Sequence, residues 1–99
     1  MSKHSKLYTP DGRPVLGVLA ERVISLAGQL SGVQEVCTAG VRGYKGGQRV
    51  KIRQEESGCL PIVICEPSGE YSLRIKTPNP AATSNALRQI LGRNRITVA

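Results

Sequence analysis

The sequence predicts an α+β fold, a two-layer sandwich in which a mainly antiparallel sheet of four to five strands carries two helices on one face. Two segments with helical spacing of apolar residues flank four segments with strand character, in the order α-β-β-β-β-α-β. The 99 residues suffice for one hydrophobic core and are too few for two. Because the chain has no Phe and no Trp, that core must be built mainly from Val, Ile, Leu and Ala.

Two regions are expected along the chain. Residues 1–13 are polar and basic and contain a Thr-Pro-Asp-Gly turn signature, so we expect a flexible N-terminal arm. Residues 14–99 are expected to form a single domain. From residue 14 to about residue 30 the apolar side chains recur three or four positions apart, which predicts an amphipathic helix that buries the stripe Leu16, Leu19, Val23, Ala27 and Leu30.

Four strands are predicted next, at residues 33–41, 49–55, 59–65 and 71–76. The glycine-rich residues 43–47 are expected to form a hairpin tip between the first two. The third strand is apolar throughout except for Pro61, and proline cannot donate to a ladder, which indicates an edge strand. An apolar edge strand in turn suggests pairing with a second copy.

A second helix is predicted to begin at Pro80, because Asn79 is a good N-cap and proline suits the first helical position. Its apolar stripe ends near Gly92, and residues 96–98 are expected to form a short last strand.

Strict alternation in two strands predicts a cationic sheet face. At residues 49–53 and 71–76, aliphatic or aromatic side chains alternate with polar or basic ones, so the basic set points away from the core. If both strands belong to one sheet, their cations share its outer face. With the loop side chains, the predicted nucleic-acid-binding set is Arg42, Tyr44, Lys45, Arg49, Lys51, Arg53, Arg74 and Lys76.

Nucleic acid, either RNA or DNA, is therefore the expected partner. The formal net charge is +7 and the sequence pI is about 9.8, and the charge is patterned rather than scattered. Tyr44 is placed to stack on an unpaired base. The lack of Phe and Trp argues against a sheet of aromatic stacking residues, so binding should be mainly electrostatic and weakly sequence-specific.

The alternative is a protein-interaction module or assembly subunit, whose basic face meets an acidic protein. A homodimer through the third strand would then bury an apolar interface composed of Leu60, Ile62, Val63 and Ile64. Burial of all four within one chain would remove the main support for this alternative.

Other functional classes receive little support from the residues. His4, the only histidine, lies in the expected arm, and the three cysteines sit in apolar contexts, so no catalytic residues are assigned. No close ligand pair indicates a metal site, and no cofactor or small-molecule substrate is expected. No apolar run approaches the length of a membrane span, and an odd cysteine count favours reduced thiols and a cytoplasmic location.

Overall fold

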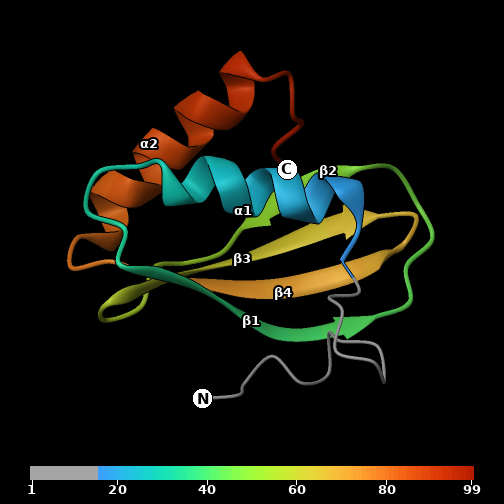
Figure 1. Ribbon diagram of the computed structural model, residues 1–99, viewed down its shortest axis with the longest axis horizontal. Coiled ribbons are helices and arrows are strands. Elements are labelled where there is room, and N and C mark those ends of the chain that lie inside the picture. The colour runs from blue at the N-terminus through green and yellow to red at the C-terminus, as the bar shows by residue number, and fades with distance from the viewer. Residues whose placement is uncertain (1–15) are drawn as a thin grey trace.

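Two helices cover one face of a four-stranded antiparallel sheet, which confirms the predicted α+β sandwich (Figure 1). The computed structural model describes residues 16–99, so the expected arm at residues 1–13 and His4 lie outside the described residues. The elements are α1 (Val18–Gly28), β1 (Glu35–Arg42), β2 (Arg49–Ile52), β3 (Cys59–Glu66), β4 (Gly69–Lys76) and α2 (Pro80–Arg93).

The strands are arranged in the order β1-β4-β3-β2. β1 and β2 follow each other in the sequence but lie at opposite edges of the sheet, and residues 43–48 connect one edge to the other. The prediction of a hairpin tip at residues 43–47 is therefore wrong. Side-chain alternation indicates which face a strand buries, but it carries no information about which strand lies beside it. The hairpins of this sheet are β2–β3 and β3–β4.

β3 is a central strand, so the expectation that it forms an edge is also wrong. Pro61 is accommodated because of its position relative to the end of β2. The N–H of Arg53 donates to the carbonyl oxygen of Pro61 at 2.9 Å, and Arg53 lies just beyond Ile52, the last residue of β2. In an antiparallel pair the N–H and C=O of one residue face the same neighbour. The donor that proline lacks thus falls where the ladder with β2 is ending.

The core lies between the sheet and the helices and is almost entirely aliphatic, as the composition predicts. Tyr71 is the aromatic member, and 1% of its surface is exposed. Its hydroxyl pairs with the Ser68 hydroxyl at 2.9 Å, so the polar end of the buried ring has a partner. The other fully buried core side chains include Val23, Val50, Leu60, Ile62, Ile64, Leu73, Ile75, Leu87 and Leu91.

α1 begins at Val18, later than residue 14, and its first turn is capped from the far end of β3. Gly17 precedes the helix in an extended conformation and supplies no side-chain cap. The carboxylate of Glu66 instead accepts hydrogen bonds from the backbone N–H of Leu19 at 3.2 Å and of Ala20 at 2.8 Å. These donors have no partner within the helix, and the positive end of the helix dipole favours a carboxylate there.

α2 starts as predicted, with Pro80 in its first turn and the Asn79 side chain accepting from the N–H of Ala82 at 3.2 Å. After α2, the C-terminal residues lie along the outer edge of β2. Val50 donates to the carbonyl oxygen of Thr97 at 2.9 Å and accepts from the N–H of Ala99 at 2.8 Å. The expected last strand is thus an isolated parallel bridge rather than a full strand.

Candidate nucleic-acid interface

The sheet face opposite the helices, called the outer face, displays alternate residues of all four strands. Directly opposed residues in adjacent strands share a face, so the register arranges the outward side chains in rows across the sheet. The prediction that Arg49, Lys51, Arg74 and Lys76 share one face is confirmed by this register. The rows are Arg42–Glu70–Cys65–Arg49, then Gly40–Ser72–Val63–Lys51, then Cys37–Arg74–Pro61, and finally Glu35–Lys76–Cys59.

Three cations on or directly after β2 form the β2 cation row, which consists of Arg49, Lys51 and Arg53. Alternate residues of a strand are about 6.6–6.8 Å apart, so the three charges follow one line along the edge of the outer face. Arg49 and Lys51 are half-buried and Arg53 is exposed. Among residues 16–99, no carboxylate forms an ion pair with any of the three. Within this part of the chain, no ion pair offsets their positive charge.

Arg49 is more enclosed than an ordinary surface arginine. Its Nε is buried and has no hydrogen-bond partner within the part of the chain that the structure describes. Arg49 is directly opposite Cys65, which is fully buried, so its aliphatic stem lies beside the neighbouring strand.

The cations of β1 and β4 differ from this row because each has a carboxylate partner. Arg42 Nε lies 3.0 Å from Glu70 Oε1, and Lys76 Nζ lies 3.6 Å from Glu35 Oε1. Arg74 Nη1 lies 2.7 Å from Glu56 Oε1. The unpaired positive charge of the outer face, among residues 16–99, is thus concentrated at β2. The sequence pattern could not show this difference, because cations alternate with apolar residues in both β2 and β4.

Arg74, Glu56 and Cys59 form a polar cluster on this face. Besides Glu56, the Nη1 of Arg74 contacts the Sγ of Cys59 at 3.5 Å, and that sulfur lies 3.5 Å from the same Glu56 oxygen. The hydrogen bond to Glu56, then that to Cys59, raises the pKa of the Arg74 guanidinium above its usual value. Arg74 is consequently a permanent cation held at one place on the sheet.

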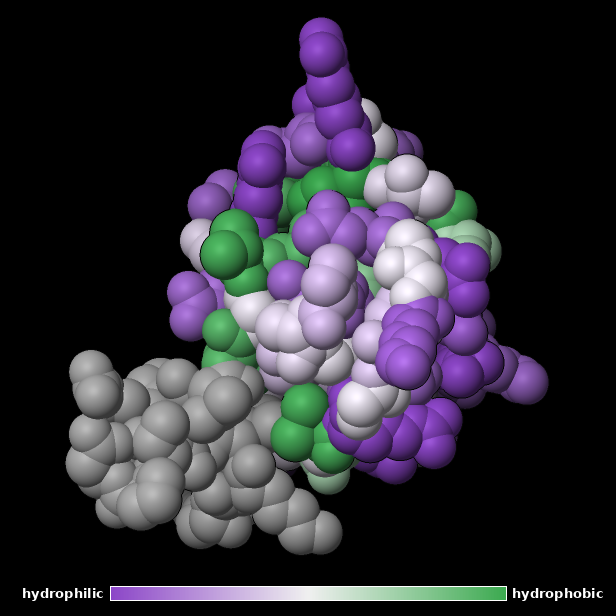
Figure 2. All heavy atoms as spheres, turned by 90° about the vertical axis from the view of Figure 1, so that its right-hand side faces the viewer, coloured by the Kyte–Doolittle hydropathy of each residue, from purple (hydrophilic) through white to green (hydrophobic). Residues whose placement is uncertain are grey.

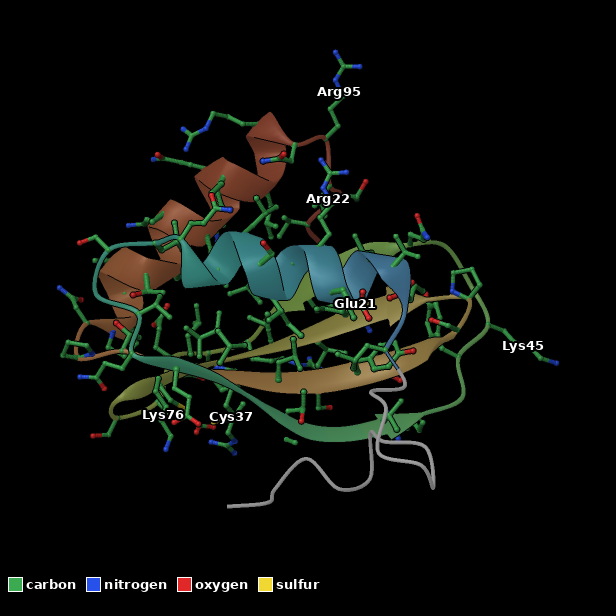
Figure 3. All side chains as sticks on the ribbon, viewed as in Figure 1. Glu21, Arg22, Cys37, Lys45, Lys76 and Arg95 are labelled. Atoms are coloured by element: carbon green, nitrogen blue, oxygen red, sulfur yellow. The ribbon has the colours of Figure 1, made fainter. Side chains whose placement is uncertain are left out.

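The loop at residues 43–48 separates the two side chains expected at its tip. The Tyr44 hydroxyl donates to the carbonyl oxygen of Gly47 at 3.0 Å, and the ring packs against Gly46. Tyr44 therefore stabilises its own loop. Lys45 is exposed and extends away from the sheet (Figure 3).

A cavity of about 470 Å³ opens on the outer face between β1 and the turn that joins β2 to β3. In Figure 3, Cys37 and Lys76 both lie on the side of the sheet away from the helices, where this cavity is found. Sequence reasoning missed it, because the cavity depends on β1 lying next to β4. Its lining consists of Cys37, Thr38, Ala39, Ser57, Gly58, Cys59, Arg74 and Lys76.

The apolar residues of β3 do not form an exposed surface. Leu60, Ile62 and Ile64 point into the core with 0 to 1% of their surface exposed, and Val63, on the outer face, is 7% exposed. All four are buried within one chain, so the homodimer interface expected at residues 60–64 loses its main support.

Figure 2 shows the end of the molecule that carries the loop at residues 43–48. On this surface the hydrophobic side chains form separate groups with hydrophilic side chains between them.

The three cysteines do not assemble into a metal site in the part of the chain that the structure describes. Cys37, Cys59 and Cys65 are buried, and none of the three forms a disulfide within residues 16–99. Within residues 16–99, no group of three or more His, Cys, Asp or Glu side chains is arranged to hold a metal ion. Neither helix of this region has the length and apolar character needed to cross a membrane.

Comparison with known proteins adds no assignment, since no protein-family model, curated protein or solved structure matches this chain. The class that can be stated is a small α+β sandwich domain with both helices on one face of its four-stranded sheet.

Proposed function

We propose that this protein is a small, non-enzymatic nucleic-acid-binding module whose outer sheet face contacts phosphates. The observation that carries the proposal is the β2 cation row: Arg49, Lys51 and Arg53 have no carboxylate partner among residues 16–99. The formal net charge of +7 supplies the long-range attraction that brings a polyanion to the surface.

The expected mode of binding is electrostatic and weakly sequence-specific. Phosphate contacts position a protein on a nucleic acid, whereas base contacts specify sequence. The β2 cation row offers the first kind of contact. An aromatic side chain on the outer face would supply base stacking, but the outward residues of the four strands include none. RNA and DNA both remain within the proposal.

The test is a fluorescence anisotropy titration of labelled random single-stranded RNA and duplex DNA at low and moderate salt. The variant Arg49→Ser/Lys51→Ser/Arg53→Ser should weaken binding, and the log–log salt slope should fall by roughly 0.7 to 0.9 for each phosphate that the protein no longer neutralises. Circular dichroism of the variant should be unchanged, because these side chains lie outside the core.

A matched control distinguishes the effect of losing the β2 cation row from the effect of losing three positive charges. Arg88→Ser/Arg93→Ser/Arg95→Ser removes the same three charges from exposed positions on and after α2, on the helical side of the molecule (Figure 3). It should retain most of the affinity. Equal losses in both variants would contradict the outer face as the site. Absence of binding by the unmodified protein at low salt would reject nucleic acid as the partner and leave the charge to a protein partner or to solubility.

A further inference from the structure

The 470 Å³ cavity on the outer face is separate from the β2 cation row, because Arg49, Lys51 and Arg53 do not line it. It lies across the sheet, where Cys37 of β1, Arg74 of β4 and the turn at Ser57 and Gly58 meet. A volume of this order is typical of pockets that enclose small molecules, which are mostly apolar with a few convergent polar groups.

The lining combines an apolar wall with positive charge. Cys37 and Cys59 are 5% and 9% exposed, and with Ala39 they form the apolar part of the wall. Arg74 and Lys76 are the charged members, and no acidic side chain from residues 16–99 lines the cavity. An occupant that complements this wall has an apolar body and a negative head.

Arg74 presents a cationic group suited to such a head. Its hydrogen bonds to Glu56 and Cys59 both use Nη1, so neither of these two residues occupies Nε or Nη2. A guanidinium presents a planar fork that binds a carboxylate or phosphate through two parallel hydrogen bonds. The ion pair with the Glu56 carboxylate, at 2.7 Å, is an example within the protein of a carboxylate bound to this guanidinium.

We propose that this cavity binds a small organic anion, with its carboxylate or phosphate on the guanidinium of Arg74 and its apolar body against Cys37, Cys59 and Ala39. Glu56 is then a competitor for the same cation. It approaches from the turn between β2 and β3 and is half-exposed, so it leaves Arg74 at little energetic cost when an anionic ligand enters.

The probes are benzoate and phenyl phosphate, with benzyl alcohol as an uncharged control of similar shape. Each is titrated into the ¹⁵N-labelled protein, and backbone amide shifts are followed by NMR. Benzoate or phenyl phosphate should produce saturable shifts at Thr38, Ser57, Gly58 and Cys59. Use of both anions distinguishes a carboxylate site from a phosphate site.

Two substitutions should move the affinity in opposite directions. Arg74→Gln removes the cation and should weaken benzoate binding by about tenfold, whereas Glu56→Gln removes the competitor and should strengthen binding by roughly threefold. Arg88→Gln, an exposed arginine of α2, should change neither the affinity nor the pattern of shifts.

Several results would overturn the proposal. Equal binding of benzyl alcohol and benzoate would show that charge plays no part, and shifts confined to other surfaces would show that the cavity is not the site. Unchanged affinity in Glu56→Gln would exclude competition for Arg74, and this variant decides the question if Arg74→Gln fails to fold. If the β2 row variant loses nucleic-acid binding, its affinity for benzoate should still be unchanged, because the β2 cation row does not line the cavity.

Discussion

The carboxylate of Glu66, at the end of β3, accepts a hydrogen bond from the backbone N–H of Ala20 in the first turn of α1 at 2.8 Å. Its second oxygen accepts from Leu19 at 3.2 Å. Glu66 is 3% exposed, so this cap is shielded from water. The hydrogen bond joins residues 46 positions apart and fixes where the helix begins above the sheet.

Replacing Glu66 should therefore destabilise the fold. Glu66→Ala leaves two backbone donors of α1 without a partner, and the free energy of unfolding should fall by about 1 to 3 kcal/mol. Glu66→Gln keeps one acceptor oxygen and should cost less. Urea denaturation followed by circular dichroism measures both values. A Glu66→Ala protein as stable as the parent would show that the cap contributes nothing.

A side chain at Gly17 should destabilise the fold, because it would force the capping carboxylate of Glu66 to move. A Cβ at this position would overlap Ser68 Oγ and the carboxyl group of Glu66. Gly17→Ala should lower the free energy of unfolding by about 1 to 3 kcal/mol.

Gly28, at the other end of α1, provides the matched control. A Cβ there meets nothing within 4 Å, and Gly28→Ala should stabilise by about 0.4 to 1 kcal/mol. Thermal denaturation of both variants tests the pair. Similar changes at the two positions would contradict a role for the close approach at Gly17.

Lys51 and Lys76 should differ as phosphate-binding residues, although both project from the outer face. Lys76 lies 3.6 Å from Glu35, whereas Lys51 has no carboxylate partner among residues 16–99. If the β2 cation row binds nucleic acid, Lys51→Ser should reduce affinity and lower the salt slope by roughly 0.7 to 0.9, and Lys76→Ser should have the smaller effect. Anisotropy titrations at several salt concentrations compare them. A larger loss at Lys76 would place the binding site on β4.

The faces of the strands were predictable from the sequence because alternation has a direct physical meaning. Val50 and Leu73 had to be buried and Lys51 and Arg74 had to be outward, since burying unpaired cations is costly. The start of α2 was predictable for a similarly local reason, since Asn79 and Pro80 carry their own capping chemistry.

Features that depend on strand order were not predictable. Cys37 lies opposite Arg74 only because β1 joins the free side of β4, and no local pattern in β1 encodes that neighbour. The cavity and the ion pair between Arg42 and Glu70 follow from the same pairing. The prediction of an edge strand from Pro61 failed because a local signal was given too much weight. The N–H that proline lacks matters only where the adjacent ladder continues, and the ladder with β2 is ending at Pro61.

The position of β1 also has a consequence for synthesis on the ribosome. β1 is made before β2 and β3, yet its only strand neighbour among residues 16–99 is β4, with Glu35 opposite Lys76 and Arg42 opposite Glu70. The β2–β3 and β3–β4 hairpins need only local loop closure, whereas β1 must wait for a strand that emerges later. The nascent chain therefore carries β1 without its strand neighbour until β4 has been translated, so the first of the four strands to be made must join the sheet late.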